Sequence, residues 1–395
     1  MISKDMLALG RQGSIIRAIF EYGNRRKAEI GAENVFDFSL GNPSVPTPKS
    51  VTDAIHEALN EIDPVQLHGY TSAPGNLTVR AAIASSIHDR FGVPSTPDCI
   101  YMTAGAAASL TIALKALLLP GEEVLVPVPY FPEYRTFIEN AGGKLTEIAP
   151  DEHMFPDLAD LENKLTPNVK AIILNSPNNP SGAVYTTEII EKLTSLLKKK
   201  SKELGSPIYL ISDEPYRELV WSDTEVPYLP CYYANTLVCY SYSKSLSLPG
   251  ERIGYIALSP TIEDKTEVFA AVCGAGRSLG FVCAPSLFQS VVAKCTTEHS
   301  DFSVYIENRN LLLSALGEYG YTTIKPDGAF YLFMKSPEED AYAFCDRAKK
   351  YELLLVPSDD FGIKGYVRIS YCVSTEQIKR SLPAFKALAK EYGLC

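Results

Sequence analysis

The chain has 395 residues, of which 46% are hydrophobic and 21% are charged, and this composition is typical of a globular protein rather than a disordered one. Its 47 acidic residues outnumber its 37 basic residues, so the formal net charge is −10. This negative charge repels a phosphate backbone and an anionic bilayer, which argues against nucleic-acid and membrane partners.

The cysteines and the N-terminal segment predict a reduced, cytoplasmic protein. Nine cysteines are scattered along the chain and none has CxxC spacing, so neither a disulfide framework nor a thiolate metal site is expected. The first residues, MISKDMLALGRQGS, have no cationic segment leading into an apolar stretch, as a secretory signal would. No uncharged apolar run approaches the roughly 18 residues that a membrane span needs.

Short apolar runs alternate with helical patterns through the middle of the chain. Fully apolar strands that are separated by helices predict a mostly parallel sheet covered on both faces, the α/β class. The functional groups of such a sheet collect at the carboxyl ends of its strands. The expected strands are 99–103, 123–127, 144–148, 170–175, 208–213, 237–242 and 253–258, with helical segments such as 106–119 and 187–204 between most of them.

The pattern changes after about residue 285, which predicts a second, smaller α+β domain. Its expected elements are a long helical stretch at 286–319, a strand at 329–334, a helix at 341–351, strands at 353–356 and 367–371, and a closing helix. We therefore predict three parts: an arm at 1–45 that also contributes to the small domain, a large domain at 46–285 and a small domain at 286–395.

Polar side chains close two of the predicted strands. Asp213 ends the strand IYLISD, where its carboxylate either faces a ligand or caps the next helix. Lys244 ends the segment LVCYSYSK, an unusual position because burial disfavours an ammonium ion and lowers its pKa. An amine of lowered pKa can form a Schiff base, whereas a lysine that snorkels to solvent at the sheet edge does no chemistry. These two positions alone leave both alternatives open.

A third strand end favours the chemical interpretation. The strand AIILN ends at Asn175 and runs into the turn-rich segment SPNNPSG, which presents Asn178 and Asn179. An amide, a carboxylate and an amine at three strand ends match the needs of pyridoxal phosphate, which takes a Schiff-base lysine, an acid for its ring nitrogen and donors for its phenolate oxygen. The segment 103–107 follows a strand and opens a helix, so the backbone around Gly105, Ala106 and Ala107 can hold a phosphate.

The chain resembles the class I/II pyridoxal-phosphate-dependent aminotransferases of fold type I, including the aspartate aminotransferases. The resemblance extends in order over nearly the whole chain. It is carried by the segments FSLGNPSVPTP, HGYTSAPGNLTVRAAIA, TAGAAASL, PVPYFPEY, SPNNPSG, SDEPYREL, SYSKSLSLPGERIGY, KPDGAFYLF and VRISY.

The resemblance implies roles for the cofactor-side residues. Lys244 is similar to the catalytic lysine that links to the cofactor and moves the substrate proton, and Asp213 to the acid that keeps the ring nitrogen protonated. Asn179 and Tyr216 match the pair that bonds the cofactor's 3-oxygen, and Tyr130 matches the aromatic residue that stacks on the ring. The matching phosphate-side residues are Gly105, Ala106, Ala107, Ser241, Ser243 and Arg252.

The resemblance also implies substrate-side and partner residues. Gly41, Asn179 and Arg368 match the site for the substrate α-carboxylate, which a planar guanidinium binds bidentately. Tyr70 matches a tyrosine that reaches the phosphate from a neighbouring subunit, which implies a homodimer with composite active sites. Arg277 stands at a plausible distance after Lys244 for binding a side-chain carboxylate, although a surface or interface ion pair explains it equally well.

The predicted function is ping-pong transamination between an L-amino acid, aspartate or aromatic, and a 2-oxo acid. A carbon–sulfur β-lyase on the same fold is the alternative, because both reactions begin with the same proton abstraction. A more remote alternative is a serine acylase, since residues 241–244 have the SxxK pattern, but SDN-like and KTG-like elements are absent from the sequence. The segment 274–280 has GxGxxxG spacing after a helical pattern, so a dinucleotide site is not expected.

Overall fold

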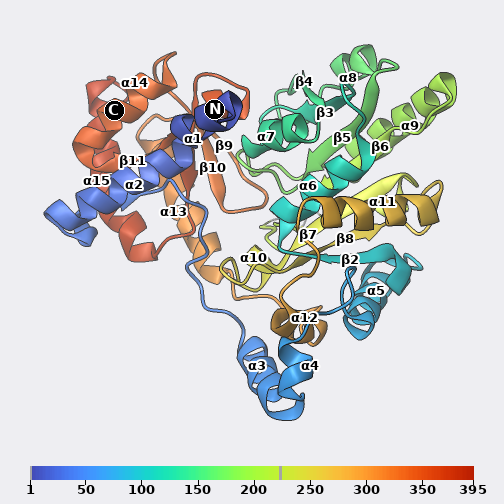
Figure 1. Cartoon of the computed structure of the whole chain (residues 1–395). Coiled ribbons are helices and arrows are strands. Elements are labelled where there is room, and N and C mark those ends of the chain that lie inside the picture. Colours follow the sequence, from blue (N-terminus) through green and yellow to red (C-terminus); the bar gives the residue numbers. More distant parts are fainter. Residues whose placement is uncertain (1, 222–224) are drawn as a thin grey trace.

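The computed structural model describes residues 2–221 and 225–395, and its centre is a seven-stranded sheet (Figure 1). The strand order is β2-β8-β7-β6-β5-β3-β4, and within this sheet only β8 runs antiparallel to its neighbours. The predicted mostly parallel α/β sheet is therefore confirmed. The strands are β2 (Ile100–Thr103), β3 (Glu123–Pro127), β4 (Lys144–Ile148), β5 (Val169–Asn175), β6 (Tyr209–Asp213), β7 (Thr236–Ser241) and β8 (Gly254–Leu258).

Both faces of this sheet carry apolar side chains. Successive side chains of a strand point to opposite faces, and the central strands are continuous apolar runs. In β5, Ala171 and Ile173 belong to one apolar cluster, while Ile172 and Leu174 belong to another. Helix α6 contributes Leu110 to the first cluster, and α9 lies against the second. The surrounding helices are α5 (Leu77–Phe91), α6 (Ala106–Leu117), α7 (Glu133–Asn140), α8 (Leu158–Lys164), α9 (Thr187–Leu204) and α11 (Lys265–Ser278).

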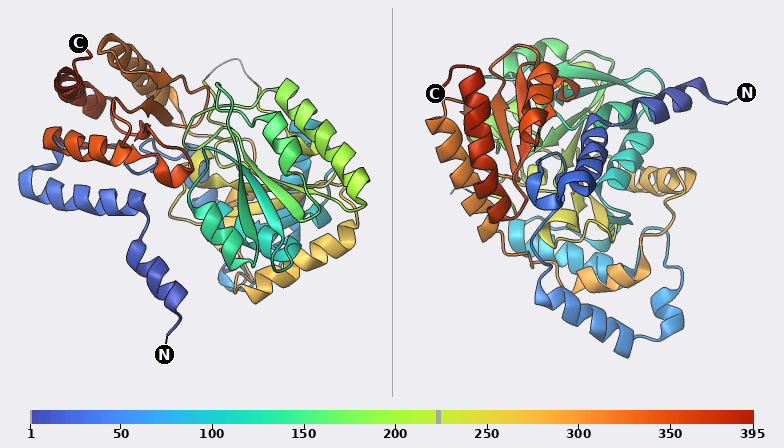
Figure 2. Two further views of the ribbon diagram at one scale, coloured as in Figure 1. Left: turned by 90° about the horizontal axis from the view of Figure 1, so that it is seen from above. Right: turned by 90° about the vertical axis from the view of Figure 1, so that its left-hand side faces the viewer.

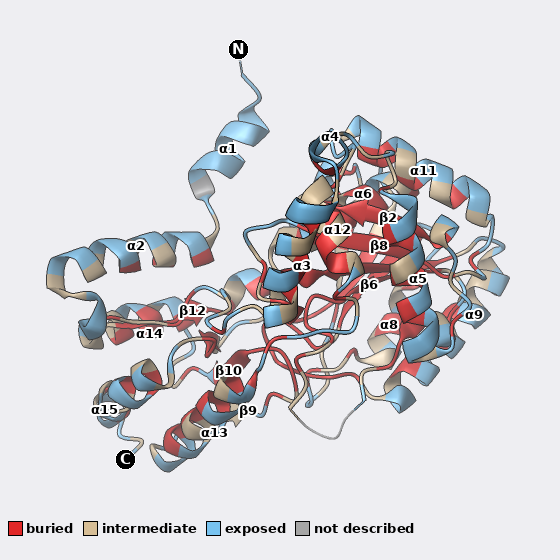
Figure 3. Cartoon of the chain, turned by 90° about the horizontal axis from the view of Figure 1, so that it is seen from below, coloured by how far each residue is buried: buried red, intermediate tan, exposed pale blue. Residues whose placement is uncertain are grey.

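A smaller four-stranded antiparallel sheet, in the order β12-β13-β10-β9, packs against three helices and forms an apolar cluster of its own, separate from the two clusters of the larger sheet. Its strands are β9 (Thr323–Ile324), β10 (Tyr331–Lys335), β12 (Val356–Pro357) and β13 (Tyr366–Ser370). Its helices are α13 (Ser303–Glu318), α14 (Ala341–Ala348) and α15 (Thr375–Glu391). The buried faces of Figure 3 show this cluster beside the larger sheet.

The N-terminal segment joins the smaller part of the molecule. Strand β1 (Phe36–Asp37) pairs in parallel with β11 (Leu353–Leu354). Helix α2 (Ile15–Ile30) buries Ile16 and Ile19 against Phe361 and neighbouring apolar side chains. Helix α1 (Lys4–Gln12) instead projects away from the rest of the chain (Figure 2), and its Met6 and Leu9 are exposed.

The stretch 286–319 differs from its prediction because it forms two helices rather than one. Helix α12 (Ser286–Ala293) packs against α3 (Lys49–Glu61), α4 (Pro64–His68) and α5, and α13 follows after a break. The intervening sequence TTEHSD is polar, and the carboxylate of Asp301 accepts a hydrogen bond from the backbone N–H of Ser303. This bond gives a partner to the first N–H of the new helix, whose N-cap residue is Phe302. The domain boundaries at 45 and 285 stay predictions.

Candidate active site

A cavity of about 260 Å³ lies at the carboxyl ends of β5, β6 and β7, where strands of the smaller sheet approach the larger one. Elements far apart in the sequence line it, from helix α2 to strand β13, as expected for a site at the strand ends of a parallel sheet. Its lining residues are Ile16, Leu40, Gly41, Ala106, Ala107, Phe131, Asn179, Pro215, Tyr216, Ser241, Ser243, Lys244, Pro249, Arg252, Tyr331 and Arg368.

Lys244 presents its amine to this cavity from a short helix rather than from the strand. Strand β7 ends at Ser241, whose hydroxyl accepts a hydrogen bond from the Ser243 N–H and so starts helix α10 (Tyr242–Ser245). Lys244 Nζ donates to the Gly41 carbonyl at 2.6 Å. Burial lowers the pKa of Lys244 to about 8. Roughly a tenth of this amine is therefore unprotonated at pH 7, far more than for a lysine of ordinary pKa, and the unprotonated form is the nucleophile.

Asp213 lies beside the cavity, and only one of its carboxylate oxygens has a hydrogen-bond partner in the described part of the chain. Its Oδ2 accepts a hydrogen bond of 2.5 Å from the hydroxyl of Tyr134, on helix α7. Its Oδ1 is buried and has no hydrogen-bond partner within residues 2–221 and 225–395. Burial raises the pKa of Asp213 to about 7; the bond from Tyr134 acts in the opposite direction, and the nearby Glu214 carboxylate adds to the rise. Such an unsatisfied buried acceptor calls for a cationic donor.

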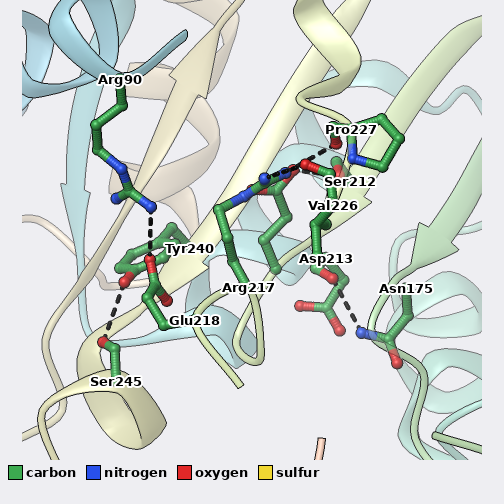
Figure 4. Close-up of polar contacts among 11 residues, drawn as sticks. Arg90, Asn175, Ser212, Asp213, Arg217, Glu218, Val226, Pro227, Tyr240 and Ser245 are labelled. Atoms are coloured by element: carbon green, nitrogen blue, oxygen red, sulfur yellow. Dashed lines mark hydrogen bonds and ion pairs between the residues drawn. The ribbon is translucent and has the colours of Figure 1, made fainter. Parts of the chain in front are cut away.

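The amide and hydroxyl groups at the strand ends form a connected set. The Asn175 side chain donates to the Asp213 carbonyl at 2.9 Å, which links the ends of β5 and β6 (Figure 4). It also accepts a hydrogen bond from the Asn179 N–H at 2.8 Å. The hydroxyls of Tyr216 and Tyr331 lie 2.9 Å apart. Tyr331 is a cavity residue that sequence reasoning missed, although it stands in the quoted segment KPDGAFYLF.

Arg368 is a buried cation that pairs with no carboxylate among the described residues. It is 1% exposed, its two terminal nitrogens donate to Asn179 Oδ1 at 3.0 Å and to the Ser39 carbonyl at 2.5 Å, and Nε has no partner in the described parts of the chain. Its guanidinium lies over the rings of Tyr331 and Phe361. Burial lowers the pKa of Arg368. A buried guanidinium with no counter-ion among the described residues favours an anionic ligand.

A corner rich in hydrogen-bond donors lies where α6 begins. Gly105 has φ +85°, and a Cβ there would lie 2.7 Å from Arg252 Nη2, so the position needs a glycine for both conformation and space. Arg252 donates to the Ala104 carbonyl at 3.3 Å and to Ser243 Oγ at 3.4 Å. The first N–H groups of α6, two serine hydroxyls and this guanidinium together suit a phosphate.

Five predicted site residues are not among those that line the cavity: Gly105 and Asp213, described above, and Tyr130, Tyr70 and Arg277. Tyr130 donates its hydroxyl to Glu147 Oε1 at 2.9 Å, and its neighbour Phe131, rather than Tyr130, lines the cavity. Tyr70 is fully exposed. Arg277 is exposed on α11 and does not line the cavity of its own chain.

The SxxK pattern does not form a serine–lysine pair. Ser241 Oγ donates to Ser243 Oγ at 2.8 Å, whereas Lys244 Nζ donates to the Gly41 carbonyl. The general base of an acylase must reach the hydroxyl proton that it removes. The described contacts therefore give no support to the serine acylase alternative.

Comparison with known proteins decides the family. The sequence model described as "Aminotransferase class I and II" matches residues 33–385. The chain belongs to the class I and II aminotransferases. The aspartate aminotransferase of Thermotoga maritima is 32% identical over 357 residues, which cover 89% of this chain and 90% of the relative. The aromatic-amino-acid aminotransferase 2 of Thermococcus litoralis is 28% identical over 399 residues, covering 96% and 97% of the two chains.

Solved structures agree with this membership. The crystal structure of an amino transferase from Eubacterium rectale has a TM-score of 0.97 and 52% identity, and the match covers 99% of both chains. The aspartate aminotransferase from Thermus thermophilus with maleate has a TM-score of 0.86 and 26% identity, covering 98% of this aminotransferase and 99% of that chain. The predicted membership and fold are therefore confirmed.

Proposed function

We propose that this aminotransferase uses pyridoxal phosphate, held between the α6 corner and the strand ends of β5, β6 and β7. The observation that carries the proposal is the unpartnered Oδ1 of Asp213, which would accept from a protonated ring nitrogen. Arg252, Ser241 and Ser243 would bind the phosphate, and Phe131 would replace Tyr130 as the residue that packs on the ring. The residues present therefore fit the group.

The roles of the chain's own groups follow from their chemistry. Bound pyridoxal phosphate supplies an electron sink for the pair that is left when the substrate Cα loses its proton. Lys244, with its lowered pKa, would remove that proton and return it. Arg368 would bind the α-carboxylate with two parallel hydrogen bonds. Tyr216 and Asn179 would donate to the phenolate oxygen of the cofactor.

The substrate proposal is an aromatic L-amino acid rather than aspartate. The relatives are named for both aspartate and aromatic amino acids. The cavity lining includes Ile16, Leu40 and Phe131, which suit an apolar substrate side chain, and each lining cation already has a proposed partner. Arg277 stays a prediction for binding a side-chain carboxylate, and that role would require a neighbouring subunit.

A panel of amino donors with 2-oxoglutarate tests the substrate and the reaction together. Glutamate formation that is fastest with phenylalanine or tyrosine would support the proposal, and a faster reaction with aspartate would contradict the substrate assignment. Release of ammonia and pyruvate from cysteine-type donors without glutamate would instead indicate the β-lyase reaction.

We also propose a cytoplasmic homodimer in which Tyr70 reaches the neighbouring subunit's phosphate site. Exposed apolar side chains support the dimer. Leu77 follows Tyr70 closely in the sequence, and Phe281 is close to Cys283, whose thiol donates to the Thr71 carbonyl. Helix α1 also exposes Met6 and Leu9. Within the described residues, no helix combines the length and the apolarity of a membrane span. Sedimentation of an active monomer would contradict the dimer.

A further inference from the structure

A buried ion pair stands directly behind Asp213 on the same chain segment. Glu214 and Arg217 have side chains only 2% and 5% exposed, and the Arg217 Nε–H donates to Glu214 Oε2. The other Glu214 oxygen accepts from the Ser212 hydroxyl at 2.7 Å. The Glu214 N–H donates to the Cys239 carbonyl at 2.9 Å, which fixes this carboxylate beside β7.

Arg217 uses the rest of its guanidinium to hold a second segment. Its Nη1 and Nη2 donate to the carbonyls of Val226 and Pro227 at 3.0 and 3.1 Å (Figure 4). The group also lies 5.1 Å from the ring centroid of Phe91 and 5.2 Å from that of Tyr228. A planar cation with several fixed donors is suited to this site, whereas the ammonium of lysine is not.

The position of this pair matters for the neighbouring acid. Two carboxylates in a poorly solvated environment resist being ionised together, so an uncompensated Glu214 would work against the ionised form of Asp213. Arg217 is the cation bonded to Glu214 in the described parts of the chain. The titratable groups around the two acids are Tyr134, Tyr216 and Cys239 at Asp213, and Arg217, Tyr228, Tyr255 and Cys239 at Glu214.

We propose that Arg217 is a positioning residue of the transamination site, which neutralises Glu214 and fixes the 212–218 segment so that Asp213 can be ionised opposite the cofactor ring. This inference rests on the proposed function. The same segment carries Tyr216, so loss of Arg217 would disturb both cofactor-facing side chains. A purely structural residue would not change the pH dependence of cofactor binding, whereas a residue that neutralises Glu214 would change it.

The test measures binding of pyridoxamine phosphate to the apoprotein from pH 5 to 9, because this probe binds without linking to Lys244. We compare the wild type with Arg217→Gln, Glu214→Gln and the double variant. Arg217→Gln should weaken binding at pH 7 about tenfold and move the acid-side midpoint to higher pH, since a shift of one pKa unit corresponds to a tenfold change. The double variant should recover affinity to within about threefold of the wild type, and Glu214→Gln should move the midpoint to lower pH.

The Arg90→Gln variant is the matched control. Arg90 pairs with Glu218 at 3.1 Å, one residue beyond Arg217, and this pair does not contact Asp213 (Figure 4). Its removal should leave the midpoint unchanged. A double variant that binds no better than Arg217→Gln would overturn the proposal. An unmoved midpoint in Glu214→Gln would also overturn it. This second result decides the question even if circular dichroism shows that Arg217→Gln does not fold. A wild type that does not bind the probe contradicts the proposed function itself.

Discussion

Tyr134 donates a hydrogen bond of 2.5 Å to Oδ2 of Asp213, while Oδ1 of the same carboxylate has no partner among the described residues. The tyrosine comes from helix α7 and the acid from the end of β6, so the bond joins the helix layer to the reactive edge of the sheet. It fixes the carboxylate and leaves one oxygen for a ligand.

The Tyr134→Phe variant removes the donor that favours ionised Asp213. The pKa of Asp213 should therefore rise further above its value of about 7, and affinity for pyridoxamine phosphate at pH 7 should fall about threefold to tenfold. Equilibrium dialysis measures this loss, which should shrink as the pH rises to 9. Tyr185→Phe, at another fully buried tyrosine, should keep wild-type affinity. Equal losses in both variants would contradict the specific role of Tyr134.

The amine of Lys244 should react with acylating reagents at a lower pH than ordinary lysines. Burial lowers its pKa to about 8, so the unprotonated fraction reaches one half near pH 8 rather than near 10.5. Competitive labelling of the apoprotein followed by peptide mass spectrometry measures this midpoint. Peptides that carry the exposed Lys49 report the reactivity of the reagent. A Lys244 midpoint above pH 10 would contradict the burial argument.

Arg368→Lys should raise KM for every amino donor about tenfold or more, with a smaller change in kcat. An ammonium cannot replace the paired donors of a guanidinium on a carboxylate, and one such charge-assisted bond contributes about 1.5–3 kcal/mol. Steady-state kinetics with phenylalanine, aspartate and alanine test this prediction. In Arg277→Ala, KM for phenylalanine should stay unchanged because this arginine does not line its own cavity. An unchanged KM in Arg368→Lys would remove Arg368 from the carboxylate site.

Gly105→Ala should weaken cofactor binding through crowding at Arg252. Both Gly105 and Gly121 have φ near +85°, but a Cβ at Gly105 would lie 2.7 Å from Arg252 Nη2, whereas nothing lies within 4 Å at Gly121. Alanine at Gly105, whose φ +85° and ψ 176° are accessible mainly to glycine, should cost about 1–3 kcal/mol of unfolding free energy, and alanine at Gly121, with its positive φ, should also be destabilising. Only Gly105→Ala should also lower the affinity for pyridoxal phosphate. Similar affinity in the two variants would contradict the phosphate corner.

Much of the fold followed from local patterns in the sequence. The seven predicted strands all occur. Most are short apolar runs buried on both faces, whereas the edge strand β4 (KLTEI) is only partly buried. The helices at 106–119 and 187–204 correspond to α6 and α9. The polar residues Asn175, Asp213 and Lys244 also lie near one another, because parallel strands end at one edge of the sheet. The expectation that functional groups collect at the carboxyl ends of parallel strands thus predicted where the cavity lies.

Other features depended on tertiary contacts that local patterns do not determine. In the turn that holds Tyr130 and Phe131, the choice of which ring faces the cavity depends on the Tyr130 bond to Glu147, a residue of the next strand. Tyr331 reaches the site only because the smaller sheet lies against the larger one. The break before α13 falls in the polar sequence TTEHSD, inside an otherwise helical pattern.

The covalent attachment of pyridoxal phosphate to Lys244 is the central claim and can be measured directly. The purified protein is incubated with the cofactor, reduced with borohydride, digested and analysed by mass spectrometry. We predict a phosphopyridoxyl group on the peptide that contains Lys244, and its loss in Lys244→Arg. A modified Lys244 peptide that never appears, while other lysines are labelled, would contradict the account.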